Sequence, residues 1–464
     1  MCGVFGIWSR EEDVARLTYF GLQALQHRGQ ESAGIAVGDG KTVTTVKNLG
    51  LVAQVFEETD LKSLPGIVAI GHTRYSTTGS SNAWENAQPH MSSIGRQLIA
   101  LGHNGNLVNT AQLRERLINE GVHLSSTTDS EAIASLVGEF TKRTSHIREG
   151  IAETMKIIRG AYAVVLITES ALYAFRDPQG IRPLCIGELA NGHGFVVSSE
   201  TCGLDIVGAH FVREVEPGEV IKISENGLET LGGVPAAHKA LCMFEYVYFA
   251  RPDSEIDGAS MYQVRYQMGT CLAQEAPIEA DMVMGVPDSG VPAAAGFAHA
   301  SGIPYGDGLA KNRYVGRTFI APSQLQRELG IRLKLNPLRH QIEGKRLVVV
   351  DDSIVRGNTM RQLVKMLRDF GAKEVHMRIT SPPVMWPCYY GIDIDSRDQL
   401  IAPHKSIDEI REHIGADSLA YISVEGMVES TGHSADQFCL ACFNGDYPVE
   451  VSGDMAGNKL AYEG

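Results

Sequence analysis

The chain has 464 residues, of which 44% are hydrophobic and 21% are charged. This length exceeds one ordinary core, and the composition is that of a globular protein with two or three domains, which excludes fibrous and broadly disordered classes. The formal net charge of −14 opposes nonspecific binding to nucleic acid or to an anionic membrane. We therefore expect neither partner, and any anionic ligand must be held by a local cluster of positive charge.

Charged residues follow the first apolar run almost at once, beginning with Arg10 and Glu11. A secretory signal would instead place a basic segment before a long apolar one, and a membrane span needs about eighteen apolar residues in a row. Neither pattern occurs, so the sequence predicts a cytoplasmic protein. In such a protein eight cysteines favour thiol chemistry or metal ligation over disulfides.

Up to about residue 230 the chain shows short apolar runs of strand-like composition, separated by Gly and Asn or Asp turns. Two amphipathic segments interrupt these runs. Residues 14–25 follow Asp13, a helix-capping residue, and residues 129–141 follow Thr127 and Thr128. This pattern predicts an α+β arrangement in which helices cover sheets.

Beyond about residue 235 the pattern changes to strand, loop and helix in repetition. DMVMGV leads through PDSG into an Ala-rich helix that ends near Gly302, and RLVVVDD leads through SIVRGNT into a helix that ends before Gly371. Apolar strands that are buried on both faces predict a mainly parallel sheet. The predicted domains are residues 2–231 and 241–451, joined by a linker at 232–240 and followed by a polar tail at 452–464.

Cys2 would become the N-terminal residue if Met1 were removed. An α-amino group has a pKa near 7.7–8.0, so it can accept the thiol proton directly or through water, and the cysteine needs no histidine. Taken by itself, a cysteine at position 2 is more simply explained as an ordinary second residue without a catalytic role. Four further segments fit an amide hydrolase that acts through Cys2.

In HTRYST, Arg74 can bind a substrate carboxylate with two hydrogen bonds. LGHNGNL places Asn104 beside Gly105, so a side-chain amide and an unhindered backbone N–H can both face a tetrahedral oxyanion. Asp129 in TTDSE suits an α-ammonium group. Each segment also has a purely structural interpretation. Arg74 could balance a nearby charge, HNGN could form a hairpin turn, and Asp129 could cap a helix. HRGQES, with Arg28 and Gly29, fits a helix-ending turn or the floor of the pocket.

In this order after MCGVFGI, the segments resemble the N-terminal-nucleophile glutamine amidotransferases, which hydrolyse glutamine to glutamate and ammonia through a thioester. The resemblance covers about the first 230 residues and implies a four-layer αββα sandwich. It also implies that Cys2 acts as nucleophile and base, that Arg74 and Asp129 bind glutamine with Arg28 and Gly29 nearby, and that Asn104 and Gly105 form the oxyanion hole. Processing should require only the removal of Met1.

RLVVVDDSIVRGNT, residues 346–359, delivers Asp351 and Asp352 from a buried strand to a loop that opens a helix. Two adjacent carboxylates cannot both be buried unpaired. The loop offers small residues, hydroxyls and backbone N–H groups at a helix N-terminus, which suits a phosphate. The acidic pair suits ribose hydroxyls and Mg²⁺. A capped turn with an acidic surface is the structural alternative.

The complete string resembles the phosphoribosylpyrophosphate (PRPP) fingerprint of type I phosphoribosyltransferases. That fold implies a pyrophosphate loop, which VPDSG at 286–290 resembles, and a basic flap, which KNRYVGRTFI at 311–320 resembles. Residues 311–346 carry nine basic and two acidic side chains, a local well for a polyphosphate. The implied PRPP-binding residues are Asp288, Ser289, Gly290, Lys311, Tyr314, Asp351, Asp352, Ser353, Ile354, Val355, Arg356, Gly357, Asn358 and Thr359, with Ser289, Asp351 and Asp352 also associated with Mg²⁺.

Glutaminase followed by phosphoribosyltransferase, with FEYVYFARPDS at 244–254 just after the linker, resembles the glutamine PRPP amidotransferases over nearly the whole chain. The resemblance implies amination of PRPP to 5-phosphoribosylamine with release of glutamate and pyrophosphate, the first committed step of de novo purine (IMP) biosynthesis. It further implies an internal ammonia channel, one Mg²⁺ per subunit that arrives with PRPP, a homotetramer, and inhibition by AMP, ADP or GMP.

FCLACF places Cys439 and Cys442 in a C-x₂-C step, which can ligate one metal centre. Cys242 in LCMFEY and Cys388 in WPCYYG are candidates for the remaining ligands, ahead of the less suggestive Cys185, Cys202 and Cys271. One branch of the resembled family carries a 4Fe-4S cluster on cysteines in these contexts. The resemblance thus implies one structural 4Fe-4S cluster on Cys242, Cys388, Cys439 and Cys442, with a four-cysteine zinc site as the alternative.

A different class of function is a regulator, because a phosphoribosyltransferase fold can sense nucleotides or PRPP without catalysis. A sensor has no need of Cys2, Arg74, Asn104, Gly105 and Asp129 together, so the sequence favours the enzyme. Amidotransferases that make amino sugars or asparagine share only the first half, and a pure electron carrier would leave both predicted sites unexplained.

Overall fold

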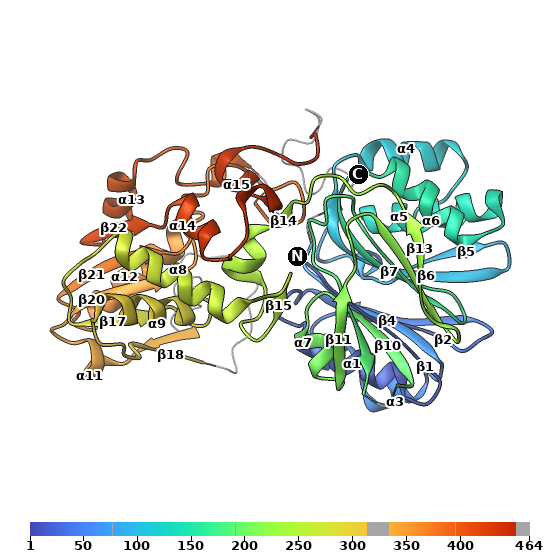
Figure 1. The fold of residues 1–464 in the computed structure, drawn as a ribbon, viewed down its shortest axis with the longest axis horizontal. Coiled ribbons are helices and arrows are strands. Elements are labelled where there is room, and N and C mark those ends of the chain that lie inside the picture. Colours follow the sequence, from blue (N-terminus) through green and yellow to red (C-terminus); the bar gives the residue numbers. More distant parts are fainter. Residues whose placement is uncertain (77, 191, 313–333, 395, 452–464) are drawn as a thin grey trace.

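The computed structural model describes residues 1–76, 78–190, 192–312, 334–394 and 396–451. The elements up to β13 form one body and those from β14 onward form a second, and the start of the chain lies between them (Figure 1). This two-domain architecture confirms the predicted change of pattern near residue 235. No helix among the described residues is long and apolar enough to cross a membrane.

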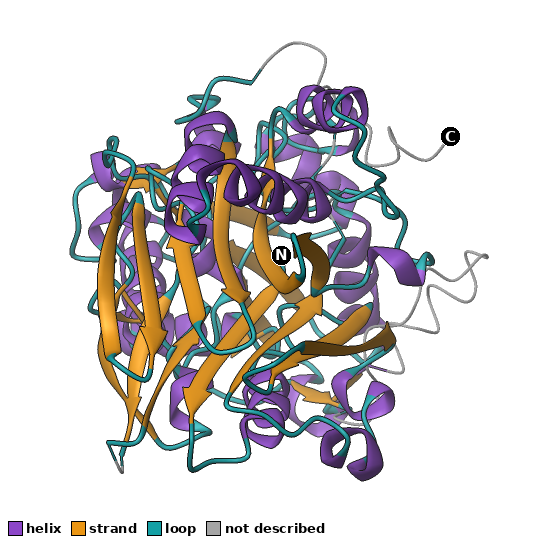
Figure 2. Cartoon of the chain, turned by 90° about the vertical axis from the view of Figure 1, so that its right-hand side faces the viewer, coloured by secondary structure: helices purple, strands orange, loops and turns teal. Residues whose placement is uncertain are grey.

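Two antiparallel sheets form the middle of the N-terminal body (Figure 2). The strand order of the first sheet is β11-β9-β10-β1-β4-β2-β3, and that of the second is β13-β12-β8-β7-β6-β5. The first sheet consists of β1 (Gly3–Ser9), β2 (Ser32–Gly38), β3 (Val43–Leu49), β4 (Val68–Arg74), β9 (Cys185–Leu189), β10 (Gly194–Ser198) and β11 (Ala209–Glu214). The second consists of β5 (His90–Ile94), β6 (Gln97–Leu107), β7 (Gly160–Ile167), β8 (Leu172–Arg176), β12 (Glu219–Ser224) and β13 (Gly227–Gly233).

Alternation along the strands builds three apolar layers in this body. On β4, Val68 and Ile70 pack between the two sheets, whereas Ala69 packs on the outer side against helix α1. On β7, Ala163 and Val165 likewise face inward, and the residues between them face the other helices. The predicted αββα sandwich is therefore confirmed. Its helices are α1 (Val14–Ala24), α2 (Val52–Val55), α3 (Glu58–Lys62), α4 (Thr110–Asn119), α5 (Asp129–Thr144), α6 (Ile147–Ile157) and α7 (Cys202–Asp205).

The second body contains a parallel sheet of order β17-β20-β21-β22 with helices on both faces. On β20, Val348 and Val350 pack toward α8 and α9, whereas Leu347 and Val349 pack toward α12 and α13. The predicted parallel sheet is thus confirmed. These elements are β17 (Met282–Gly285), β20 (Arg346–Asp351), β21 (Glu374–Ile379), β22 (Ser418–Tyr421), α8 (Met261–Glu275), α9 (Gly290–Ser301), α11 (Arg339–Ile342), α12 (Asn358–Asp369), α13 (Ile407–Ile414), α14 (Val424–Glu429) and α15 (Ala441–Asn444).

Several short elements complete the second body. A π-helical turn, η2 (Glu245–Phe249), follows β14 (Leu241–Cys242), which pairs in parallel with β23 (Phe438–Cys439) near the other end of the chain. Two further pairs are β15 (Glu255–Ile256) with β16 (Ala259–Ser260), and β18 (Leu309–Lys311) with β19 (Leu335–Pro337). The predicted linker begins inside β13, which runs to Gly233. Its remainder is fixed to the first body, because the N–H groups of Ala237 and Ala240 donate to the carbonyls of Pro178 and Gln179.

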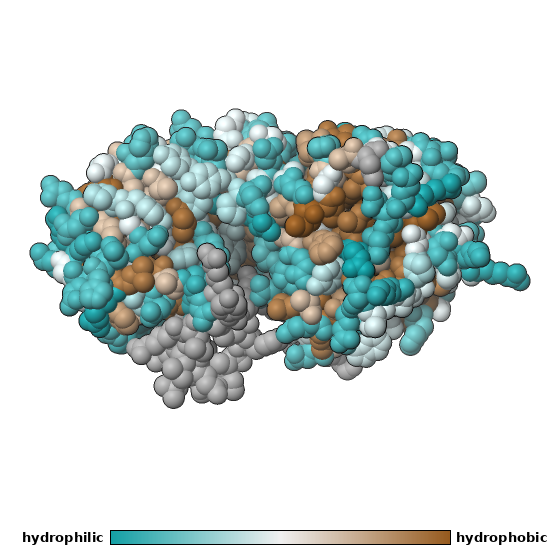
Figure 3. Space-filling view, turned by 90° about the horizontal axis from the view of Figure 1, so that it is seen from below, coloured by the Kyte–Doolittle hydropathy of each residue, from teal (hydrophilic) through white to brown (hydrophobic). Residues whose placement is uncertain are grey.

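On the face seen from below, surface hydropathy differs between the two bodies. Seen from below, hydrophobic residues gather over the N-terminal body (Figure 3). The large exposed apolar side chains of this body include Ile206, Phe211 and Val212, which belong to α7's C-cap and to the edge strand β11. An edge strand with exposed apolar side chains is a typical site of contact with another chain.

Candidate functional site

Cys2 lies directly before β1 and is almost fully buried. Its Sγ donates a hydrogen bond to the Tyr75 carbonyl at 3.6 Å, and its backbone N–H donates to Asn104 Oδ1 at 3.1 Å. Burial raises the pKa of the Cys2 thiol, although the nearby N-terminal amino group and Arg74 act in the opposite direction. Formation of the thiolate therefore requires a base, which is the role predicted for an α-amino group on Cys2.

Asn104 and Gly105 lie side by side on β6. With Asn104 Oδ1 occupied by the Cys2 N–H, its buried Nδ2 has no partner among the residues that the structure describes. A buried donor without a partner costs about 1–3 kcal/mol, so such a group points to an absent acceptor. Gly105 has φ +146°, and a Cβ there would lie 2.0 Å from the Ala161 carbonyl oxygen, so only glycine fits. Both features suit the predicted oxyanion hole.

Arg74 ends β4, and its guanidinium donates to the carbonyls of Ser80 at 3.0 Å and Thr78 at 2.9 Å. Asp129 begins α5, where its Oδ2 accepts from the Leu107 N–H at 3.0 Å. Both side chains are buried. Arg74 thus holds the loop that follows it, and a substrate carboxylate would have to replace these carbonyl oxygens.

Arg28 and Gly29 form the turn beneath this site. A Cβ on Gly29 would lie 2.5 Å from the Thr73 carbonyl oxygen, so the turn packs directly on the backbone that leads to Arg74. Arg28 Nε donates to the Cys2 carbonyl at 2.9 Å, and the rest of the guanidinium binds Glu200 and Glu245. The backbone of this turn therefore packs against the end of β4, with the Arg28 side chain fixed behind Cys2, and its part in the floor of a glutamine pocket stays a prediction.

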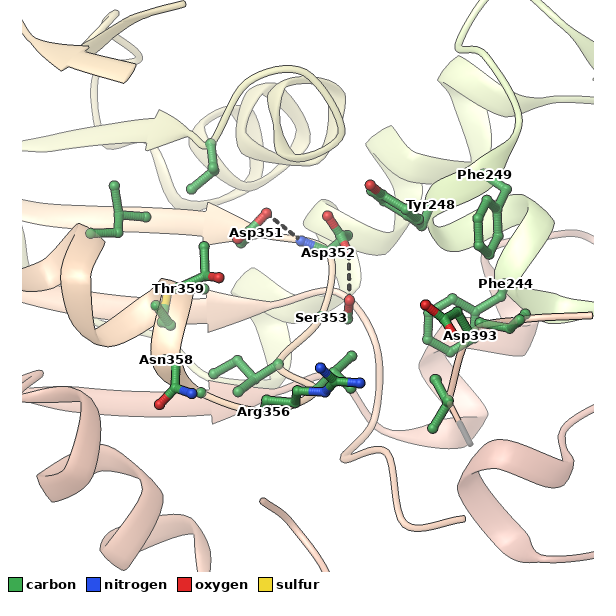
Figure 4. A pocket seen from close by; sticks show the side chains of 18 of the residues that line it. Phe244, Tyr248, Phe249, Asp351, Asp352, Ser353, Arg356, Asn358, Thr359 and Asp393 are labelled. Carbon is green, nitrogen blue, oxygen red and sulfur yellow. Dashed lines mark hydrogen bonds between the residues drawn. The ribbon is translucent and has the colours of Figure 1, made fainter. Parts of the chain in front are cut away.

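A cavity of about 440 Å³ opens beyond the carboxyl end of β20 (Figure 4). This size lies within the ordinary range for small-molecule sites. All nine predicted residues from Asp351 to Thr359 line it. Across the cavity lie Phe244, Tyr248 and Phe249 from η2 and its N-cap, together with Asp393.

The acidic pair is held by hydroxyl groups. Ser289 Oγ donates to Asp352 Oδ1 at 2.6 Å, Ser353 Oγ donates to Oδ2, and the Asp352 N–H donates to Asp351 Oδ1 at 2.9 Å. Burial and the neighbouring Asp352 carboxylate raise the pKa of Asp351 well above its usual value. Two carboxylates and two hydroxyls form an oxygen-rich group with excess negative charge, which fits Mg²⁺.

The other predicted PRPP residues lie around this centre. Gly290 begins α9, and a Cβ there would lie 2.4 Å from the Val350 carbonyl oxygen, so the pyrophosphate loop packs on the end of β20. Lys311 forms an ion pair with Asp288. Tyr314 and the predicted flap from residue 313 onward lie outside the described residues.

The four cysteines predicted to bind iron gather beside the interface of the two bodies. Pairing of β14 with β23 places Cys242 opposite Cys439. The Trp386 N–H donates to the Cys442 carbonyl at 3.1 Å, which brings the segment with Cys388 alongside. Burial raises the pKa of Cys242 to about 11, and burial and the other three cysteines raise that of Cys442. No disulfide joins them, and no group of three or more His, Cys, Asp or Glu that could hold a metal ion is found among the described residues.

Known proteins match both bodies. A glutamine amidotransferase domain model matches residues 72–205, and a phosphoribosyl transferase domain model matches residues 262–380. The amidophosphoribosyltransferase of Synechococcus elongatus is 54% identical over 100% of this chain and 94% of its own length. That of Bacillus subtilis is 48% identical over 98% of this chain and 95% of its own length.

The chain belongs to the amidophosphoribosyltransferase family. A solved structure of glutamine PRPP amidotransferase from B. subtilis, complexed with ADP and GMP, superposes with a TM-score of 0.90, at 48% identity over 98% of this chain and 99% of that chain. A second, described as the allosteric regulatory enzyme of purine biosynthesis, has a TM-score of 0.92, at 47% identity over 99% of this chain and 98% of that chain. The family resemblance inferred from the sequence is thereby confirmed.

For this member of the amidophosphoribosyltransferase family, sequence reasoning missed several residues that line the cavity. Phe244, Tyr248, Phe249 and Asp393 carry no motif, although the FEYVYF segment stood out just after the linker. Tyr75 also lines the cavity, and it is the residue whose carbonyl accepts from Cys2 Sγ. Its position directly after Arg74 was the available signal.

Proposed function

We propose that the protein converts glutamine, PRPP and water to 5-phosphoribosylamine, glutamate and pyrophosphate, in the first committed step of de novo purine biosynthesis. One observation carries the proposal: Tyr75 lines the cavity that holds the PRPP fingerprint, while its carbonyl contacts the Cys2 thiol. The two predicted sites therefore meet at one residue. We further propose residues 2–231 as the glutaminase domain and 241–451 as the phosphoribosyltransferase domain, in a cytoplasmic enzyme.

At the first site, removal of Met1 would free the α-amine of Cys2 to accept the thiol proton. The thiolate adds to the side-chain carbonyl of glutamine, and the oxyanion accepts hydrogen bonds from Asn104 Nδ2 and the Gly105 N–H. Collapse releases ammonia and leaves a thioester on Cys2. Water then hydrolyses the thioester to glutamate and restores the thiol. Arg74 and Asp129 bind the α-carboxylate and α-ammonium of glutamine.

At the second site, the backbone and hydroxyl groups of residues 353–359 hold the 5-phosphate, and Asp351 and Asp352 face the ribose. Ammonia adds to the anomeric carbon as the bond to pyrophosphate breaks, and the positive charge that develops on the ribose ring is stabilised by the acidic pair. Ser289, Asp351 and Asp352 would hold Mg²⁺, which would supply charge compensation for a pyrophosphate leaving group.

Ammonia would pass between the sites along the surface that the two bodies share. Tyr75 Oη donates to Asp393 Oδ2 at 3.3 Å, and Asn106 Nδ2 donates to the Tyr389 carbonyl at 2.9 Å. The first contact ties the residue after Arg74 to the wall of the cavity. The second ties β6, the strand with Asn104 and Gly105, to the segment that leads to Asp393. A closed route keeps ammonia from being protonated in bulk water, which would remove its nucleophilic lone pair.

A 4Fe-4S cluster on Cys242, Cys388, Cys439 and Cys442 would clamp the end of the chain to the start of the second body. Support comes from the register that places Cys242 opposite Cys439, from the free state of the four thiols, and from cysteine as the ligand that such clusters use. Its chemistry here is structural, because the proposed reaction moves no electrons. Iron and sulfide analysis with the visible absorption spectrum tests the assignment, and stoichiometric zinc in colourless protein would favour the alternative.

AMP, ADP or GMP would compete with PRPP at the cavity and bind a neighbouring site. The relative from B. subtilis was solved with ADP and GMP. These nucleotides carry a phosphate on the ribose 5-position, as PRPP does, so the same phosphate-binding loop of the cavity could hold either ligand. A homotetramer is proposed as well, and the exposed apolar side chains of Phe211 and Val212 on edge strand β11 support contact between copies. Analytical ultracentrifugation tests this assembly.

The test of the reaction is the release of glutamate and pyrophosphate from anaerobically prepared protein, with and without PRPP. Equal release of both products, with glutamine hydrolysis stimulated by PRPP, is expected. Glutamate release that ignores PRPP would contradict the coupling. Release of neither product, from protein shown by mass to lack Met1, would favour a PRPP or nucleotide sensor.

A further inference from the structure

A buried group of four charges lies behind Cys2, where the two bodies meet. Arg28 binds Glu245 through its two terminal nitrogens, with Nη2 to Oε1 at 2.7 Å and Nη1 to Oε2 at 3.0 Å, and it also binds Glu200. Arg182 Nη1 lies 3.5 Å from Glu245 Oε1. All four side chains are 0% exposed. Although burial opposes its charge, Glu245 and Glu200 raise the pKa of Arg28, so this guanidinium remains ionised.

Arg28 is the direct link from this group to the nucleophile. Its Nε donates to the Cys2 carbonyl at 2.9 Å, so every nitrogen of the guanidinium has a defined acceptor. The planar, bidentate pair with Glu245 fixes the plane of the guanidinium and therefore the direction of Nε. The position of the Cys2 backbone thus depends on a carboxylate that is 217 residues away from Arg28 in the chain.

Glu245 begins η2, the segment that faces the phosphoribosyl cavity. Phe244 directly before it and Tyr248 and Phe249 after it line that cavity opposite Asp351 and Asp352 (Figure 4). Arg265 of α8 donates to the carbonyl of Tyr246 in η2 at 2.8 Å and to that of Ala250, the C-cap of η2, at 2.7 Å, so the turn is anchored to the second body. A single turn therefore contacts the cavity on one side and Arg28 on the other.

We propose that Glu245 is a positioning residue for Cys2, and that η2 transmits occupancy of the phosphoribosyl cavity to the nucleophile through the Glu245–Arg28 pair. This inference rests on the proposed function. Glu245 touches neither glutamine nor the reacting atoms, so its effect passes through Arg28. Loss of its charge leaves Arg28 and Arg182 buried with Glu200 alone, and the uncompensated charge drives the guanidinium away from its place on the Cys2 carbonyl.

The test is Glu245→Gln in the full chain, with hydrolysis of glutamine and synthesis from added ammonia measured separately. We expect kcat for glutamine hydrolysis to fall by about tenfold to a hundredfold, the effect of a small misplacement. Stimulation by PRPP should be lost, while KM for glutamine and ammonia-dependent release of pyrophosphate stay within about twofold. The matched control is Glu58→Gln, which removes a bidentate partner from Arg16 at the surface, and it should change none of these values.

The outcomes separate the inference from the proposed function. Wild-type protein that shows no PRPP-stimulated hydrolysis would overturn both. If wild-type protein behaves as proposed and Glu245→Gln keeps full hydrolysis and stimulation, only the inference is overturned. Equal losses of the glutamine-dependent and ammonia-dependent reactions would also overturn it, because they indicate general damage. Should Glu245→Gln fail to fold, Glu245→Asp keeps the charge on a side chain one methylene shorter, and intact stimulation in that folded variant would overturn the inference.

Discussion

The two sites of this protein are built in opposite ways. Cys2 is 7% exposed, and the guanidinium of the nearby Arg74 already donates hydrogen bonds to carbonyl oxygens of the loop that follows it. The site around Asp351 is instead an open cavity of about 440 Å³. The difference matches the chemistry: ammonia must be made out of contact with bulk water, apart from the one water that hydrolyses the thioester, whereas a large polyanionic substrate must enter from solvent.

The comparison also shows what each site needs before it can act. At the proposed phosphoribosyl site, residues 351–359 already line the cavity. At the proposed glutaminase site, Asn104 Nδ2 is buried without a partner among the described residues, whereas Arg74 is bonded to the carbonyls of Thr78 and Ser80, which a glutamine carboxylate would have to displace.

Cys2→Ser should abolish glutamine-dependent synthesis, by at least about a thousandfold, because a hydroxyl replaces the nucleophilic thiol. Synthesis from added ammonia should persist, since the cavity is unchanged. Pyrophosphate release measured with each nitrogen donor checks both statements. Cys271→Ser, at a half-buried cysteine outside both sites, is the control. An equal loss with ammonia would show that the two sites are not separable.

Asn104→Ala should lower kcat for glutamine hydrolysis by about 10²- to 10³-fold, the usual cost of one oxyanion-hole donor. The variant also loses the acceptor of the Cys2 N–H, which Asn104→Asp retains. We expect both variants to be impaired, because the donor Nδ2 is missing in each. Asn119→Ala at the exposed end of α4 serves as the control, and rapid hydrolysis by Asn104→Asp would assign the donor elsewhere.

Asp351→Asn should raise the Mg²⁺ concentration needed for half-maximal ammonia-dependent synthesis by about tenfold to a hundredfold. Because burial and Asp352 raise the pKa of Asp351, the neutral amide should leave Tm without Mg²⁺ unchanged or higher. Thermal unfolding with and without Mg²⁺ and PRPP provides the second readout. Asp369→Asn, in an exposed ion pair on α12, is the matched variant, and an unaltered Mg²⁺ requirement would remove Asp351 from the metal site.

His72 should make the glutaminase half sensitive to acid. Burial lowers the pKa of His72 from 6.5 to about 3. Below pH 6.5 the unfolded chain therefore binds more protons than the folded chain, and the free energy of unfolding decreases as the pH is lowered. At pH 5 the loss is about 2 kcal/mol. His72→Gln should flatten the slope of denaturant-unfolding free energy between pH 7 and pH 5, whereas His238→Gln in the exposed linker should not. Equal slopes for the wild-type protein, His72→Gln and His238→Gln would contradict the lowered pKa of His72.

The sequence predicted local features well, because each depends on neighbours in the chain. Asp13 and Thr128 cap α1 and α5 as expected, and Gly302 and Gly371 end their helices in left-handed conformations. The DDSIVRGNT string lies in one loop at the end of a strand, so its residues line the cavity together. The aromatic wall from η2 was not predicted, since nothing local marks an apolar segment as cavity lining rather than core.

The sequence by itself determined the two families of motif, the order of the domains and the residue types at each site. Only the tertiary structure decided which distant groups meet. Glu245 pairs with Arg28, Tyr75 reaches both sites, and Cys242 lies opposite Cys439. Spacing within a motif is fixed by the backbone geometry of a few residues, whereas contacts across hundreds of residues depend on how the whole domains pack.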